Sequence, residues 1–134
     1  MKEGKFKYLA SPIPLYGCLL HVLIGHDLEA LSLAAGLPTD GFNGNSLAFY
    51  NACAFRADRA EDVGYFILLK PNASANTVAH EAVHIVNKVF NDRGIKLDSN
   101  NDEPQAYFTG WVVEKINYTL TSDEIKAKKK ITLC

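Results

Sequence analysis

Two histidines and a glutamate stand close together in the segment His80-Glu81-Ala82-Val83-His84. Residues four apart lie one turn above another on an α-helix, so the rings of His80 and His84 can converge on one ion. Zinc suits such a pair, because it takes nitrogen and oxygen ligands in tetrahedral geometry and leaves one position for water. Glu81, about 100° around the helix axis, would stand beside the ion and take a proton from that water. The spacing therefore predicts a zinc-dependent hydrolase.

The residues around this motif have the periodicity of an amphipathic helix. Apolar residues fall on one arc of about 160°, and the two histidines and Glu81 fall on the opposite, polar arc. The apolar arc holds Val78, Ala79, Ala82, Val83, Ile85, Val86, Val89 and Phe90. Ser74 or Asn76 can cap the start of this helix, and Gly94 can end it. We expect the motif to lie on the polar face of the helix.

A second helix is expected from about Glu103 to Tyr118, with Pro104 in its first turn. A short loop joins it to the first helix, so the two should form an antiparallel hairpin. A catalytic zinc needs a third protein ligand, and we expect Glu103, at the start of the second helix, to supply it. Asp102 is the alternative ligand, although aspartate is also a preferred helix cap ahead of a proline.

Four further residues share the side of the second helix on which Glu103 lies: Tyr107, Gly110, Trp111 and Glu114. Tyr107 can donate its hydroxyl to the oxyanion that forms when water attacks a carbonyl, or it packs at a helix crossing. Gly110 is expected to let the two helices approach closely. Trp111 is expected to pack, with the wall of a substrate site as its alternative role.

The pattern His80-Glu81-x-x-His84, followed after eighteen residues by Glu103, resembles the gluzincin zinc metallopeptidases. The longer stretch from His80 to Glu114 looks like small uncharacterised HExxH proteins encoded by bacteriophages and prophages. This resemblance covers about a quarter of the chain. It implies that His80, His84 and Glu103 bind zinc and that Glu81 acts as the general base. The Gly-x-Met-Glu-Asn motif of exopeptidases is not present, so the resemblance leaves the substrate class open.

Length and composition place the chain among ordinary soluble globular proteins. It has 134 residues, 48% of them hydrophobic and 22% charged, which suits one domain over residues 1–134 and excludes disorder, coiled coils and polytopic membrane proteins. The net charge of −1 provides no global field for nucleic acid or an anionic membrane. The basic run Lys126–Lys130 is interpreted as a solvated tail.

The three cysteines, Cys18, Cys53 and Cys134, are odd in number and lack metal-site spacing. This favours a reducing compartment, and we expect Cys18 and Cys53 to be inert core residues. The apolar run Leu15–Ile24 superficially copies a secretory signal, but prolines precede it and a histidine interrupts it. Without a convincing signal peptide, a cytoplasmic location is expected.

The first half of the chain predicts mixed structure. Tyr16 to Ile24 is expected to form a buried strand, in which His21 is a packed core residue rather than a ligand. Asp27 to Ala35 predicts a short helix. Tyr65 to Leu69 is an apolar run that predicts a strand. By analogy with zincins this strand would edge the substrate cleft, and a central position in the sheet is the alternative.

These patterns together predict an α+β fold, with a small sheet packed on a zincin-like metal-site helix and a second, antiparallel helix. The expected function is a zinc-dependent metallopeptidase that hydrolyses peptide or protein substrates with a water activated by Glu81. A zinc-containing but non-catalytic, phage-associated binding or structural protein is the first alternative. A metal-free structural protein with an accidental motif is the second. Neither nucleic acid nor a membrane is expected as a partner.

Overall fold

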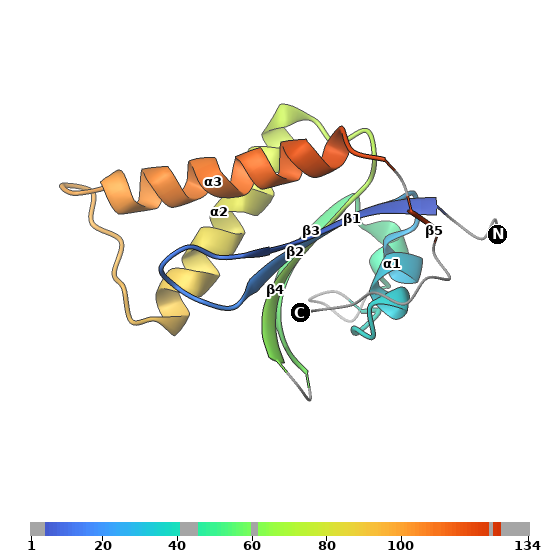
Figure 1. The fold of residues 1–134 in the computed structure, drawn as a ribbon, viewed down its shortest axis with the longest axis horizontal. Coiled ribbons are helices and arrows are strands. Elements are labelled where there is room, and N and C mark those ends of the chain that lie inside the picture. Colours follow the sequence, from blue (N-terminus) through green and yellow to red (C-terminus); the bar gives the residue numbers. More distant parts are fainter. Residues whose placement is uncertain (1–4, 41–45, 60–61, 124, 127–134) are drawn as a thin grey trace.

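A mixed β-sheet with helices on both faces forms the framework of the chain (Figure 1), which confirms the α+β prediction. The computed structural model describes residues 5–40, 46–59, 62–123 and 125–126. Its strands are β1 (Lys5–Pro12), β2 (Leu19–Ile24), β3 (Ala52–Arg59), β4 (Asp62–Leu69) and the short β5 (Ile125–Lys126). Its helices are α1 (Leu28–Ala34), a 3₁₀ turn (Leu47–Phe49), α2 (Ala75–Asp92) and α3 (Glu103–Leu120).

The strand order is β3-β4-β2-β1-β5. The two central strands, β2 and β4, run parallel, and every other neighbouring pair runs antiparallel. Helices α2 and α3 cover one face of the sheet, and α1 packs on the other (Figure 1). Strand β4 therefore lies inside the sheet, so the central position is confirmed for residues 65–69 and the cleft-edge position is wrong. Among the described strands, β3 is the edge strand beside α2.

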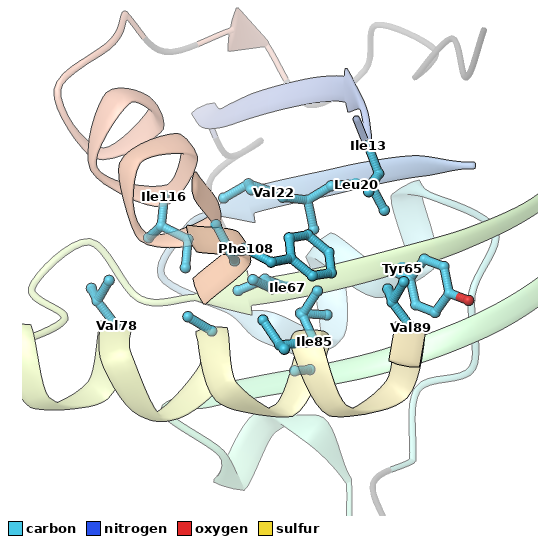
Figure 2. Packing of buried hydrophobic residues seen from close by; sticks show 14 of the residues in the cluster. Ile13, Leu20, Val22, Tyr65, Ile67, Val78, Ile85, Val89, Phe108 and Ile116 are labelled. Carbon is cyan, nitrogen blue, oxygen red and sulfur yellow. The ribbon is translucent and has the colours of Figure 1, made fainter. Parts of the chain in front are cut away.

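The central strands are largely apolar, apart from His21 in β2 and Asp62 at the start of β4, because helices bury both of their faces. Alternate residues, including Val22, Ile67 and Leu69, point toward α2 and α3. Figure 2 shows this cluster, in which Ile85 and Val89 of α2 and Phe108 and Ile116 of α3 meet the strands. The residues between them, including Leu23, Phe66 and Leu68, point toward α1. A continuous apolar run therefore indicated a strand here rather than a helix.

Local signals set the ends of α2 as expected. The Ser74 side chain accepts a hydrogen bond from the Thr77 amide at the start. At the other end Gly94 takes a positive φ of 71°, and the Ile95 amide bonds back to the Phe90 carbonyl at 2.8 Å. Only glycine adopts such a backbone without strain, which is why the helix ends there. The helix predicted around His80-Glu81-x-x-His84 is confirmed as α2, and the one predicted from about Glu103 to Tyr118 is confirmed as α3, which ends at Leu120.

The predicted strand from Tyr16 is shorter than expected, because a tight turn occupies residues 13–18. Leu15 and Cys18 both have positive φ values, 69° and 67°, and the Ile13 amide bonds to the Cys18 carbonyl at 3.0 Å. The strand β2 begins only at Leu19. Strand β1 was not predicted, although its start alternates between polar and apolar residues (Lys5-Phe-Lys-Tyr8) as a half-buried strand does.

His21 is a core residue, as expected. It is fully buried, its Nδ1 lies 2.9 Å from the Tyr8 hydroxyl, and its ring stacks on Phe66 with centroids 4.3 Å apart. Cys53 is also buried, whereas Cys18 is half-buried and accepts a hydrogen bond from Arg93, so the core prediction holds only for Cys53. Cys134 and most of the basic run 126–130 lie outside the described residues.

Two glycines give a matched test of packing. A Cβ at Gly64 on β4 would come within 3.0 Å of ring atoms of His21 and Phe66, whereas a Cβ at Gly110 on α3 would meet nothing within 4 Å. We expect Gly64→Ala to lower the free energy of unfolding by about 1–3 kcal/mol. Gly110→Ala should raise it by up to about 1 kcal/mol, because alanine favours a helix over glycine. Urea denaturation of both variants measures these shifts, and equal effects would contradict the geometry.

Within the part of the chain that the structure describes, no helix is both long and apolar enough to cross a membrane.

Candidate metal centre

The imidazoles of His80 and His84 lie together on the exposed outer face of α2. Their Nε2 atoms are 3.1 Å apart, and the ring planes are inclined by 77° with centroids 4.7 Å apart. Residues 80 and 84 are one turn apart, and both side chains are solvent-exposed. The two ring nitrogens therefore lie within hydrogen-bonding distance of each other outside the helix.

That separation fits a shared metal ion. Two nitrogens held about 2.0–2.1 Å from zinc at a tetrahedral angle are about 3.3–3.4 Å apart, close to the 3.1 Å in the structure. Without an ion, one neutral ring donates a hydrogen bond to the other at the same distance. Burial, and next the positive charge of His80, lower the pKa of His84. The lowered pKa favours the neutral imidazole, which is the form that binds metal.

Glu81 is buried, which differs from the prediction that it lies on the exposed polar arc. Its exposed fraction is 7%, whereas Val83, expected on the apolar arc, is 40% exposed. The reason is tertiary: the edge strand β3 packs along the flank of α2 on which Glu81 lies. Viewed down the axis of α2, the buried side chains therefore extend from Glu81 on one flank to Phe90 on the other. Val83 lies just outside this arc.

The position of Glu81 determines its electrostatics. Burial raises the pKa of its carboxyl group, and the positive charges of His80 and then Lys88 oppose that rise. None of the hydrogen bonds or ion pairs found among the described residues involves Glu81. Burial raises the pKa of Cys53 on β3 to about 11, and the negative charge of Glu81 adds to this shift. Glu81 is thus a desolvated carboxylate between the histidine pair and the edge strand, as a general base requires.

The expected convergence of Glu103 on the histidine pair is not seen. Among the described residues, no group of three or more His, Cys, Asp or Glu side chains is placed to hold a metal ion. Glu103 instead lines a pocket with Tyr107 and Trp111, and neither histidine lines that pocket. The loop between the two helices is long enough for α3 to begin beyond the end of α2. The predicted helical hairpin is therefore compatible with this position of Glu103.

The contact between the two helices explains the separation. The rings of Phe90 and Phe108 meet with centroids 5.8 Å apart. Phe90 lies about 9 Å beyond His84 along α2, and Glu103 lies about 7.5 Å before Phe108 along α3. Figure 1 shows that α3 crosses α2 obliquely, so its first turn diverges from α2. The start of α3 therefore lies away from the two imidazoles.

The remaining predicted site residues also lie on α3 or just before it. Asp102 precedes the helix without a side-chain capping bond, although its carbonyl accepts from the Ala106 amide at 2.8 Å. Tyr107 is 75% exposed, so the prediction that it packs at a helix crossing is wrong. Gly110 faces open space, so it does not permit a close helix approach. Trp111 is half-buried, packs against Phe108, and lines the pocket with Glu103.

The turn at residues 14–16 was not predicted to line a pocket. Pro14, Leu15 and Tyr16 line the same pocket as Glu103, and Leu15 is 97% exposed. Of these residues, only Tyr16 was expected to belong to the buried strand. The two prolines at positions 12 and 14 were the signal for a turn.

A pH-dependent gain in stability is expected when the Glu81 carboxylate is removed from the metal-free protein. Folding raises the pKa of Glu81. The protonated carboxyl group therefore adds to the stability of the fold at pH values below the pKa that it has in the unfolded chain. This effect is lost as the pH rises through the folded pKa. At pH 7 we expect Glu81→Leu to raise the free energy of unfolding by about 1–3 kcal/mol.

Chemical denaturation of the metal-free protein between pH 4 and pH 7 measures this effect. The gain from Glu81→Leu should grow with pH over this range. Glu114→Leu, at an exposed position on α3, is the control and should show no such trend. A Glu81→Leu variant that is less stable than the wild type throughout would contradict the desolvation argument.

Comparison with known proteins adds no relative, since no protein-family model, curated protein or solved structure matches the chain.

Proposed function

We propose that the protein is a zinc-dependent metallopeptidase whose centre is built on α2. The observation that carries this proposal is the 3.1 Å separation of the His80 and His84 Nε2 atoms, which is close to the spacing that one zinc ion imposes. A desolvated carboxylate, Glu81, lies on the same helix immediately beside this pair. Zinc-dependent hydrolysis needs imidazoles that bind the ion and a general base close to them, and these three side chains can supply both.

His80 and His84 would hold the ion through Nε2. When bound, zinc supplies Lewis acidity, which polarises a peptide carbonyl and makes water acidic enough to react near neutral pH. Glu81 accepts the proton of the attacking water and returns it to the leaving amine. Its burial suits the first step, because a raised pKa makes the carboxylate a stronger base.

The third protein ligand is where the proposal departs from the gluzincin pattern. The carboxylate of Glu103 lies in the aromatic pocket, so binding to the same ion would require the first turn of α3 to move toward α2. We therefore propose the two imidazoles and Glu81 as the working residues of this centre. Solvent or substrate would supply the remaining ligands of an ion held by these two histidines.

The absence of a third donor at the pair, among the residues described, favours one other candidate function. A zinc-containing binding or structural protein needs the two histidines but no turnover. In such a protein Glu81 would have no role in proton transfer.

Two measurements on the purified chain test the proposal. Elemental analysis of protein prepared without added metal should find about one zinc per chain, and incubation with a mixed peptide library should produce new termini detectable by mass spectrometry. Chelation of the zinc should stop cleavage, and adding zinc back should restore it. Stoichiometric zinc without cleavage would favour the binding protein, and protein without zinc affinity would refute a metal centre.

A further inference from the structure

A pocket that neither His80 nor His84 lines lies between the turn at residues 14–16 and the first part of α3, up to Trp111. It is a pocket of about 680 Å³, which is within the size range of ligand-binding cavities. Four aromatic rings line it: those of Tyr16, Tyr107, Phe108 and Trp111. Of all the lining residues in the described part of the chain, only Glu103 carries a charge.

The floor of this aromatic pocket is held firmly. The Tyr16 ring packs against Phe90 and Phe108, with centroid distances of 5.5 and 5.2 Å. Arg93 donates hydrogen bonds to the Tyr16 carbonyl at 2.8 Å and to the Cys18 sulfur at 3.3 Å, which ties the turn to the end of α2. A wall that is already ordered loses little entropy when a ligand binds.

The rim of the pocket is apolar and exposed. Leu15 is 97% exposed and Tyr107 is 75% exposed, and both line the opening. A cluster of exposed apolar side chains around a concave surface is typical of a binding site. The size and apolar lining therefore suit a ligand with a hydrophobic body rather than a small polar ion.

The carboxylate of Glu103 decides the charge of that ligand. Although Glu103 is exposed, a neutral occupant beside it would take away part of its hydration without compensation, which costs free energy. A cation compensates this loss, and the surrounding rings attract it further through their negative faces. The chain already pairs one of these rings with a cation, since the Lys115 ammonium lies 5.4 Å from the centroid of Trp111.

We propose that this pocket binds an arginine side chain presented by a peptide segment with apolar neighbours. A guanidinium group is planar, so it can stack on an aromatic ring while it donates paired hydrogen bonds to a carboxylate. The apolar residues beside the arginine would fill the space along Leu15 and Tyr107. The proposal does not depend on the metal centre, because neither His80 nor His84 lines the pocket.

The test uses the fluorescence of Trp111, the only tryptophan of the chain and a wall of the pocket. The intact protein is titrated with acetyl-Leu-Arg-Phe-amide and with the same peptide carrying citrulline, which has the shape of arginine without its charge. We expect the arginine peptide to bind at least about 10-fold more tightly. Mass spectrometry after each titration checks that the peptides remain intact.

Variants assign the charge preference to the pocket. Glu103→Gln, at an exposed position, should reduce the preference for arginine to less than about threefold, and circular dichroism checks that the variant is folded. Glu114→Gln on the same helix does not touch the pocket and should keep the full preference. Tyr107→Ala should weaken the binding of both peptides, because it removes part of the apolar wall of the pocket. His80→Ala should change the affinity for neither peptide, which separates this pocket from the proposed metallopeptidase centre.

Three results would overturn the inference: equal binding of the two peptides to the wild type, an unchanged arginine preference in Glu103→Gln, or no saturable binding of either peptide.

Discussion

A Glu81→Gln variant is expected to hold zinc as tightly as the wild type and to cleave peptides about 10²–10⁴-fold more slowly. Glutamine keeps the shape of the side chain but accepts no proton at neutral pH. Because the side chain keeps its size, the imidazoles of His80 and His84 should stay in place. Cleavage rates on one library-derived peptide, with zinc content measured on the same samples, give both quantities.

The control for this experiment is Glu114→Gln, which changes an exposed carboxylate on α3 and should leave turnover unchanged. Full activity in Glu81→Gln would remove Glu81 from the mechanism. Loss of zinc from the same variant would indicate instead that residue 81 supports the metal site structurally.

Loss of either imidazole should remove the metal. We expect His80→Ala and His84→Ala each to weaken zinc binding by at least about 100-fold, because a single remaining imidazole on an exposed helix face cannot retain the ion. Competition with a fluorescent zinc chelator measures the affinity. Each variant should fold normally, since both side chains are solvent-exposed.

Two comparisons sharpen the interpretation of this loss. His26→Ala removes another exposed histidine, outside α2, and should leave zinc affinity unchanged. Glu103→Gln should also retain zinc, because its carboxylate lies in the aromatic pocket. A large loss of affinity in Glu103→Gln would show that the start of α3 moves to the histidine pair when metal binds. One zinc per chain retained by His80→Ala would contradict the ligand assignment.

The elements of the fold were largely predictable because local physical signals specify them. Ser74 and Gly94 set the two ends of α2 through hydrogen bonding and a positive φ, and the apolar run Tyr65 to Leu69 specified a buried strand. These signals act over a few residues and need no tertiary context. The turn at residues 13–18 was missed because its hydrogen bonds interrupt an apolar run that otherwise indicates a strand.

The sequence by itself determined that His80 and His84 meet, because helical periodicity alone places residues four apart on one face. Only the tertiary structure decided the rest of the site. It buried Glu81, since the edge strand β3 packs on that flank of α2. It placed Glu103 in the aromatic pocket instead of at the histidines, since α3 crosses α2 obliquely and its first turn diverges from α2 (Figure 1). The physical reason is that helix periodicity fixes directions about one axis, whereas packing of large core side chains fixes how two axes cross.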